Sequence, residues 1–161
     1  MDEETTAPSW DGALLSEALR RVRLHRALTP AEVAQAMNMP LRTYQRFEAG
    51  ATRMNLEHVY RFAAATGSDA QAIFMAIAIG SPAFAVRACD NQMGAILTVG
   101  VKNFDDLMGD RIKGLDSRTL VDAVIRMFER LAGAQDEGDP SADWLERGAR
   151  ALRARRPRPG R

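Results

Sequence analysis

The sequence predicts an all-α protein, and two observations carry that prediction. Apolar residues recur every three or four positions along most of the chain, which is the spacing of one face of a helix. Residues that cap helices, together with glycine and proline at the far ends, divide these stretches into separate helices. With 161 residues, of which 46% are hydrophobic and 27% charged, the chain has room for one domain and an appendage, or for two small domains.

The first predicted helix spans about residues 13–27 and follows an acidic arm. Residues 1–11 contain four acidic side chains and no basic one, and we expect this arm to be disordered. Leu15, Ala18 and Val22 give the helix its apolar side. The helix also carries four arginines, which are Arg20, Arg21, Arg23 and Arg26. All but Arg23 are expected to form a solvated face.

A pair of short helices is predicted next, and the first of them begins at a clear cap. Thr29 and Glu32 have the spacing of a capping box, and Pro30 occupies the first helical position, where no amide hydrogen is needed. Val33 and Met37 contribute an apolar stripe at helical spacing. The sequence therefore predicts a helix from Pro30 to about Met37.

A tight turn separates this helix from the second of the pair. Asn38 tolerates left-handed backbone angles, and Pro40 cannot extend a preceding helix. The second helix should begin at about Leu41 and end at Gly50.

Tyr44 and Phe47 of this second helix are three residues apart and would face inward together. The remaining faces then carry Arg42, Thr43, Gln45 and Arg46. A helix of this kind suits a DNA major groove, although an ordinary amphipathic surface helix would show the same pattern.

Four blocks of sequence occur in a fixed order with matching gaps. They are Leu19-Arg20-Arg21-Val22-Arg23, Leu28-Thr29-x-x-Glu32-Val33-Ala34, Arg46-Phe47-Glu48-Ala49-Gly50 and Leu56-x-x-Val59-x-x-Phe62-Ala63-x-Ala65-x-Gly67. On these residues, the stretch from about 14 to 68 resembles the DNA-binding domain of the Cro/cI-type (XRE) helix-turn-helix regulators of bacteria and phages. The resemblance implies an N-terminal five-helix DNA-binding domain over residues 12–67, followed by a helical C-terminal segment.

The second short helix would then be the one that contacts bases. Arginine can donate two hydrogen bonds to guanine, and glutamine matches the edge of adenine, so base contacts are assigned to Arg42, Gln45 and Arg46. Leu41 stands at the first base-reading position of similar proteins, where it could touch a thymine methyl group.

Other residues are expected to contact phosphate or to hold the domain together. Thr43 suits a phosphate oxygen, and similar proteins grip the DNA backbone with the loop that holds Arg53 and Asn55. Arg23 and Glu48 occupy the positions at which the family forms a buried ion pair. That pair is structural, because it would fix the first helix against the base-contacting helix.

Two residues depart from the family pattern. Pro30 replaces a glutamine that commonly touches phosphate, so that contact is lost. Pro40 replaces the serine or threonine that caps the base-contacting helix, which costs about 1 kcal/mol if nothing replaces it.

Residues 68–133 are expected to form a helical dimerisation or regulatory segment. Asn55 should cap the last helix of the family pattern, and Ser68 and Asp69 can cap another that runs through Ala78. A further helix should restart at Ser81.

The later part of this segment is less regular. Residues 93–101 suit a helix or a buried strand, and we choose the helix because a strand would lack a partner. Its apolar spacing continues to Gly109. A clearer helix follows from about 117 to 133, and its broad apolar face fits either self-association or burial within one chain.

Charge is distributed unevenly along the chain, although the net charge is only +1. Residues 12–67 carry eight basic and four acidic side chains. An acidic linker is predicted at 134–143, and a basic tail at 144–161 contains seven arginines and one acidic residue, with a short helix over 144–153. Basic character is therefore concentrated in the proposed DNA-binding domain and in the tail, as DNA binding requires.

These features favour a sequence-specific transcriptional regulator that binds double-stranded DNA as a homodimer. Repression and activation both stay open, and activation would also require a surface for RNA polymerase. The alternative is a protein-interaction module on the same scaffold, such as an antitoxin or a polymerase-associated adaptor. We expect it not to be an enzyme.

The sequence lacks the usual signatures of enzymes, metal sites and membrane proteins. No phosphate-binding glycine loop or metal-ligand spacing occurs, and the single cysteine, Cys89, lacks a matching histidine, so we expect no cofactor and no metal. No apolar run is long enough to cross a bilayer. We expect a cytoplasmic, nucleoid-associated protein with neither a membrane span nor export.

Overall fold

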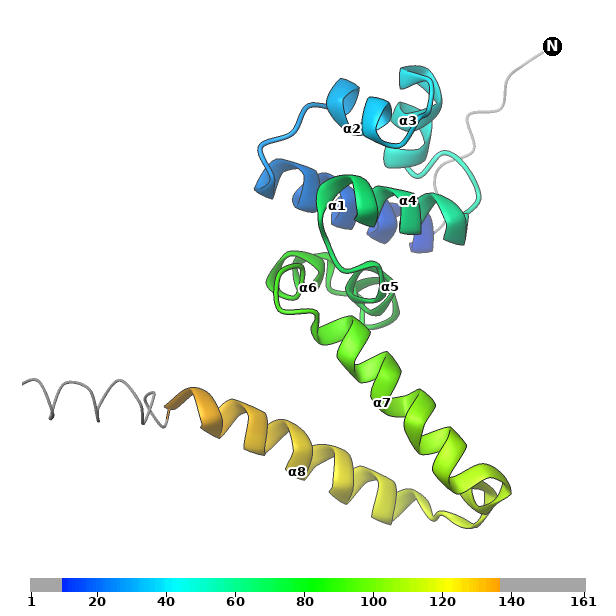
Figure 1. Ribbon diagram of the computed structural model, residues 1–161, viewed down its shortest axis with the longest axis vertical. Coiled ribbons are helices and arrows are strands. Elements are labelled where there is room, and N and C mark those ends of the chain that lie inside the picture. The colour runs from blue at the N-terminus through cyan, green and yellow to red at the C-terminus, as the bar shows by residue number, and fades with distance from the viewer. Residues whose placement is uncertain (1–9, 137–161) are drawn as a thin grey trace, which may run out of the picture. The chain divides into compact units, whose positions relative to one another are not determined.

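The structure, a computed structural model, describes residues 10–136 (Figure 1). Over those residues the chain is helical and has no strand. The helices are α1 (Trp10–His25), α2 (Pro30–Ala36), α3 (Leu41–Glu48), α4 (Leu56–Thr66), α5 (Ala70–Ala78), α6 (Pro82–Arg87), α7 (Met93–Met108) and α8 (Ser117–Asp136), with a 3-10 helix, η1 (Gly109–Gly114), before α8. The predicted all-α fold class is confirmed.

The chain divides into two compact units. The first ends at Leu107 and the second begins at Met108. The first unit therefore holds α1 to α6 and nearly all of α7, and the second holds η1 and α8. Residues 1–9 of the predicted acidic arm, residues 137–143 of the linker and the whole basic tail, including the short helix predicted at 144–153, lie outside the described residues.

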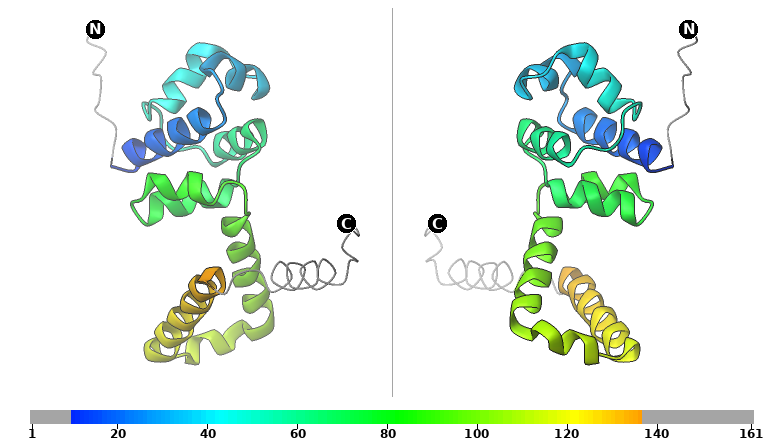
Figure 2. Two further views of the ribbon diagram at one scale, coloured as in Figure 1. Left: turned by 90° about the vertical axis from the view of Figure 1, so that its left-hand side faces the viewer. Right: turned by 90° about the vertical axis from the view of Figure 1, so that its right-hand side faces the viewer.

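In the first unit, α1 to α6 lie in three layers (Figure 1, Figure 2). α2 and α3 form one outer layer, α1 and α4 the middle, and α5 and α6 the other side. α1 packs against α3, α5 and α6, while α4 packs against α2 and α5. The largest fully buried side chains come from five of these helices, and they are Leu15, Leu19, Val22, Val33, Tyr44, Phe47, Val59, Phe62 and Ile73.

The first helix begins and ends earlier than the predicted range of 13–27. It starts at Trp10 and stops at His25 because the chain turns sharply at Ala27, whose φ is 53°. The turn is closed by the amide of Leu28, which donates to the carbonyl of Arg23 at 3.1 Å.

The hydrophobic core continues past residue 67. Ile73 and Ala76 of α5 and Ala85 of α6 are buried in the same cluster as the α1 side chains. The functional division at residue 67, with DNA binding before it and self-association after it, stays a prediction. In packing terms, α5 and α6 are part of the body that supports α1.

The segment at 93–101 is helical, as predicted, and its glycine has a packing role. A Cβ atom on Gly94 would lie 2.2 Å from the backbone nitrogen of Ala72, so the start of α7 lies directly against α5. Asp69 joins the same two helices. One carboxylate oxygen accepts from the Gln71 amide at 2.9 Å, and the other accepts from the Ala95 amide at 2.9 Å.

In the second unit, α8 is longer than predicted. It passes through Gly133, the predicted end of the helix, and reaches Asp136. Gly133 does not adopt a positive φ, and a glycine with helical angles weakens a helix without stopping it. Among residues 10–136, no helix combines the length and the apolar character needed to span a bilayer.

We predict that Gly94→Ala destabilises the protein and that Gly100→Ala, in the same helix, does not. The added methyl at 94 would collide with the backbone of α5, at a cost of about 1–3 kcal/mol. Nothing lies within 4 Å of a Cβ atom at 100, so alanine there should be neutral or stabilise by up to about 1 kcal/mol. Thermal unfolding of both variants measures this difference. Equal midpoints would contradict the close packing of α7 on α5.

Candidate nucleic-acid interface

α2 begins at the capping box that the sequence predicted. The Thr29 hydroxyl accepts a hydrogen bond from the Glu32 amide at 3.3 Å, and the Glu32 carboxylate accepts from the Thr29 amide at 2.7 Å. The bonds from the Thr29 amide and hydroxyl hold the pKa of Glu32 below its usual value. Val33 and Ala34 are buried, so the cap fixes which side of α2 enters the core.

The turn between α2 and α3 is held from outside by α4. Asn38 has φ 49°, the left-handed conformation that was expected of it. Arg61, on α4, donates to the carbonyl oxygens of Met37 and Asn38, the latter at 3.2 Å. A cation at the carboxyl end of α2 also opposes the negative end of that helix dipole. The angle between α2 and α3 is thus fixed by a third helix.

α3 has one buried side and one solvent-exposed side. Tyr44, Phe47 and Glu48 are buried, and the Phe47 ring lies edge-on to both Tyr44 and His58. The remaining side chains of the helix are exposed, and they are Leu41, Arg42, Thr43, Gln45 and Arg46. The aromatic rings therefore face the core, and every α3 residue predicted to contact DNA faces outward.

The buried side of α3 is anchored to α1 by an ion pair. Arg23 Nε lies 2.5 Å from Glu48 Oε1, and Arg23 Nη2 lies 3.2 Å from Glu48 Oε2. The Tyr44 hydroxyl donates to the same Glu48 Oε1 at 2.9 Å, and Arg23 Nη1 donates to the carbonyl of Leu28 at 3.0 Å. The expected pair is present, and Tyr44 extends it into a cluster of three side chains.

Burial and hydrogen bonding shift the pKa values of Tyr44 and Arg23 in this cluster. Removal from water and the neighbouring Glu48 carboxylate raise the pKa of Tyr44 above its usual value, so the phenol keeps its proton. Hydrogen bonding to Glu48 raises the pKa of Arg23. A neutral hydroxyl and a permanent cation thus donate to Glu48, which satisfies the buried carboxylate.

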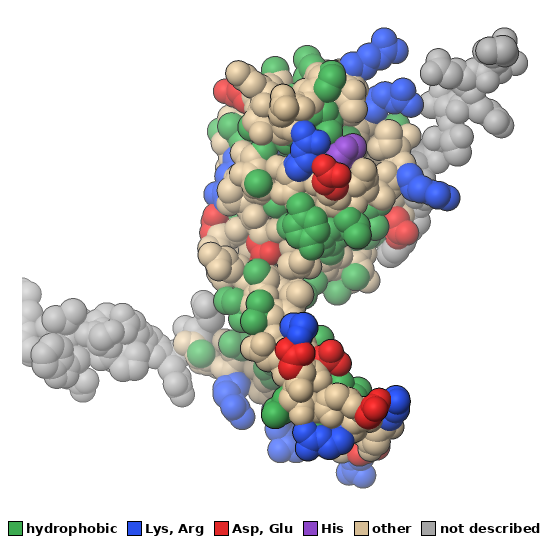
Figure 3. Space-filling model, turned by 45° about the vertical axis from the view of Figure 1, so that its right-hand side comes forward, with side chains coloured by type: hydrophobic (Ala, Val, Ile, Leu, Met, Phe, Trp, Pro, Cys, Tyr) green, Lys and Arg blue, Asp and Glu red, His purple; other side chains and the backbone are tan. Residues whose placement is uncertain are grey.

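The exposed side of α3 carries two cations, Arg42 and Arg46. Within residues 10–136, Arg42 and Arg46 make no hydrogen bond or ion pair with another side chain or with the backbone. Figure 3 shows Lys and Arg side chains projecting from the end of the first unit that α2 and α3 form. The charges of Arg42 and Arg46 face solvent and are available to an anionic ligand.

The loop after α3 is fixed by a glycine. Gly50 has φ 68°, and a Cβ atom there would lie 2.3 Å from the carbonyl oxygen of Gly12. The chain must therefore pass directly against the start of α1. Arg53 is exposed in this loop, and Asn55 caps α4 by accepting from the Glu57 amide at 2.9 Å. The positive end of the α4 dipole consequently faces the loop that carries Arg53.

Comparison with known proteins agrees with this geometry. Residues 14–73 match a family model described as a helix-turn-helix domain, of the Cro/cI-like kind. The protein contains a helix-turn-helix domain. The match ends inside α5, and no curated protein or solved structure was found to be similar to the chain. A domain of this kind indicates a DNA-binding regulator.

Pro40 stands at the cap of the second helix of the helix-turn-helix and makes no side-chain hydrogen bond there. The departure from the family pattern noted in the sequence therefore has no side-chain replacement.

Two arginines of the helix-turn-helix domain have roles that sequence reasoning missed. Arg61 holds the turn between α2 and α3. Arg26, expected on a solvated face, donates to the carbonyls of Thr66 and Gly67 at 3.0 and 2.8 Å and to Asp90 at 2.5 Å. The partners of Arg26 lie 40 or more residues away, so no local pattern identifies them.

We predict that Glu48→Ala lowers the thermal midpoint of the helix-turn-helix domain, while Arg42→Ala leaves it unchanged. Removing Glu48 leaves Arg23 buried without its counter-charge, which typically costs about 3–5 kcal/mol. Arg42 is exposed and makes no contact that folding requires. Thermal unfolding followed by circular dichroism measures both variants. An equal decrease of the thermal midpoint in the two variants would mean that the buried and exposed faces of α3 are assigned wrongly.

Proposed function

We propose that the protein is a sequence-specific transcriptional regulator that binds double-stranded DNA as a homodimer. The observation that carries this proposal is the orientation of α3. Its aromatic residues are fixed in the core by the Arg23–Glu48 pair, and its arginines and glutamine are exposed and aligned on one short helix. A helix presented in this way fits the width of the DNA major groove.

The exposed side of α3 offers a specific chemistry to base edges. Arg42 and Arg46 are one helical turn apart, and each can donate two hydrogen bonds to O6 and N7 of a guanine. Gln45 can pair with the N6 and N7 edge of an adenine, and Leu41 can contact a thymine methyl group. Each well-formed bidentate pair discriminates against a wrong base by about 1–3 kcal/mol.

Contacts to phosphate would set the register of α3 on the duplex. Thr43 is exposed on α3, and Arg53 is exposed on the loop that follows it. The first amides of α4, next to Asn55, lie at a helix N-terminus, where an anion is favoured. These contacts carry no sequence information, so they complement the base contacts of Arg42 and Arg46.

Self-association is proposed to occur through the second unit. α8 has an apolar seam with the spacing 3, 4, 3, formed by Val121, Val124, Phe128 and Leu131, which is the pattern of a coiled-coil contact. Leu120, Ile125 and Met127 widen the seam on both sides, and all seven side chains are 39–53% exposed. A seam with apolar flanks is typical of a helix that is covered by more than one neighbour.

A second copy of the chain would provide such neighbours. A two-fold interface uses the same patch on both subunits, so each α8 would cover the other. One helix-turn-helix contacts too few base pairs to specify a genomic site, and two of them about 34–36 Å apart would read a palindrome. The proposed dimer thus supplies the specificity that one domain lacks.

The direction of regulation does not follow from α3. Occupying a promoter is sufficient for repression, whereas activation also needs a surface that contacts RNA polymerase. In either case the protein would act on bacterial chromosomal DNA, and hence at the nucleoid in the cytoplasm.

We predict that Arg42→Ala combined with Arg46→Ala abolishes recovery of a palindromic motif in genome-wide crosslinking. Both base-contacting guanidinium groups would be lost, while the folded domain stays intact. The matched control is Arg87→Ala combined with Arg118→Ala, which removes the same charge from exposed positions on α6 and next to the start of α8. The control should keep the motif. Loss of the motif in both double variants would indicate that only net charge matters for DNA binding. Unchanged recovery of bound DNA after the Arg42 and Arg46 substitutions would favour a protein-interaction module.

We predict that Val124→Glu converts the dimer into a monomer. A carboxylate at the centre of the α8 seam would have to be buried without a partner, which is costly. Arg126→Glu, on the polar side of the same helix, should leave the dimer intact. Sedimentation equilibrium of the full chain measures the mass of each variant. A wild-type chain that is monomeric at micromolar concentration would contradict the proposed interface.

A further inference from the structure

Three side chains of types that can bind metals meet at one end of α1, although one of them is 64 residues from the nearer of the other two in the sequence. His25 is the last residue of α1, and Cys89 and Asp90 follow α6. His25 Nε2 lies 3.7 Å from Asp90 Oδ2, and Cys89 Sγ lies 3.4 Å from the same oxygen. One donor atom of each residue lies within 4.8 Å of the other two. No histidine close to Cys89 along the chain pointed to this grouping, and the fold brings His25 to it from the end of α1.

The position of Asp90 in this group is fixed by Arg26. The guanidinium of Arg26 donates to the carbonyls of Thr66 and Gly67 and, at 2.5 Å, to Asp90 Oδ1. That anchor uses one oxygen of the carboxylate and leaves Oδ2 facing His25 and Cys89. Packing of α1 against α6 brings the two segments together, with Ala85 and Ala88 buried beside them.

We propose that His25, Cys89 and Asp90 bind a divalent metal ion of the zinc class. Zinc bonds to sulfur at about 2.3 Å and to nitrogen or oxygen at about 2.0–2.2 Å, which puts neighbouring donor atoms of a tetrahedral site about 3.3–3.6 Å apart. The two separations that involve Asp90 Oδ2 are already close to these values. The site closes when the imidazole of His25, whose side chain is 44% exposed, turns toward the sulfur.

The donor set selects the kind of ion. A thiolate and an imidazole favour zinc, cobalt or copper, whereas magnesium and calcium prefer sites built from oxygen alone. On binding, the Cys89 thiol loses its proton to solvent and its sulfur bonds to the metal. The thiolate and the Asp90 carboxylate then balance the two positive charges of the ion.

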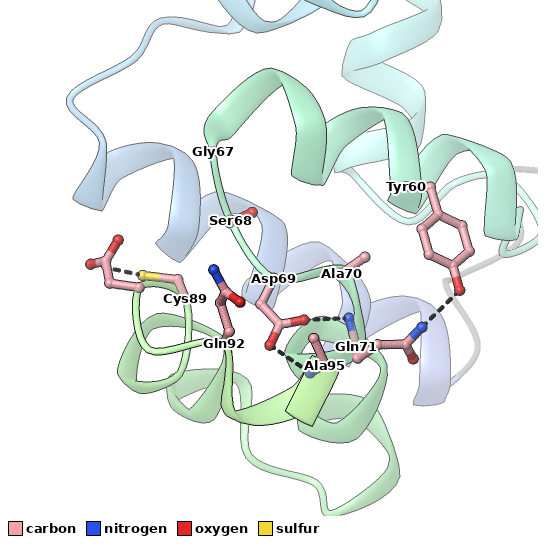
Figure 4. Close-up of a pocket in the computed structure, with 10 residues that line it drawn as sticks. Tyr60, Gly67, Ser68, Asp69, Ala70, Gln71, Cys89, Gln92 and Ala95 are labelled. Atoms are coloured by element: carbon pink, nitrogen blue, oxygen red, sulfur yellow. Dashed lines mark hydrogen bonds between the residues drawn. The ribbon is translucent and has the colours of Figure 1, made fainter. Parts of the chain in front are cut away.

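Three protein ligands leave a fourth position open. Cys89 and Asp90 also line an open pocket of about 540 Å³, together with Ser68, Asp69 and Gln92. Figure 4 shows the Cys89 sulfur at one end of this pocket and the Asp69 carboxylate beyond the Gln92 side chain. Water or a small ligand from the pocket could complete the coordination. A bound ion would tie the end of α1 to the segment between α6 and α7, and so stabilise the first unit.

Titration of the reduced full-length protein with Co²⁺ tests this site. Cobalt in a site of this type shows a charge-transfer absorption from a bonded thiolate, together with the visible bands of tetrahedral coordination. Because the chain contains one cysteine, that absorption reports on Cys89 alone. We expect saturation at one ion per chain, displacement of cobalt by Zn²⁺, and a higher thermal midpoint with Zn²⁺. His25→Gln and Asp90→Asn should each weaken binding by about 10–100-fold or more.

The control is His58→Gln, which removes the other histidine of the chain and should bind cobalt like the wild type. Circular dichroism of each variant shows that it is folded, so that weaker binding reflects the lost ligand. The proposal is overturned if no thiolate absorption appears, or if His25→Gln binds as tightly as the wild type. It is also overturned if saturation occurs at one cobalt ion per two chains, because an ion that bridges two chains would then explain the absorption.

Discussion

The buried ion pair between Arg23 and Glu48 is the interaction on which the rest of the structure depends. It joins α1 to α3, and the Tyr44 hydroxyl adds a second donor to the same carboxylate. A hydrophobic contact could be equally stable, but it would leave the rotation of a short helix about its axis less defined. Because the fork of the guanidinium fits the carboxylate in one geometry, the opposite side of α3, with Arg42 and Arg46, has one direction in which to face.

Much of this arrangement follows from local sequence. The start of α2 is defined by the capping box of Thr29 and Glu32 and by Pro30. The spacing of Tyr44 and Phe47 separates the buried side of α3 from its exposed side. Such features depend on residues within one or two helical turns, where the physical rules are strong. The Arg23–Glu48 contact spans 25 residues and was expected only through resemblance to the family.

Contacts between distant segments were not predictable from spacing. Arg61 reaches back to the turn after α2, and Arg26 joins the end of α4 to Asp90. Both look like surface arginines in the sequence. The meeting of His25 with Cys89 depends on how α6 lies on α1, which helical periodicity does not determine. The end of α8 differs from the prediction for another reason: Gly133 lacks the positive φ with which a left-handed glycine ends a helix.

The proposed contact between guanidinium groups on α3 and particular bases is measured most directly by a thermodynamic cycle between a side chain and a base. Affinity would be measured for the wild type and for Arg42→Ala, each on the recovered site and on sites in which single guanines are replaced by 7-deazaguanine, which lacks the N7 acceptor. We expect one guanine whose replacement weakens the wild type but not Arg42→Ala, with a coupling of about 1–3 kcal/mol. Additive losses at every guanine would show that Arg42 contacts no guanine N7, and would contradict the proposed bidentate contact.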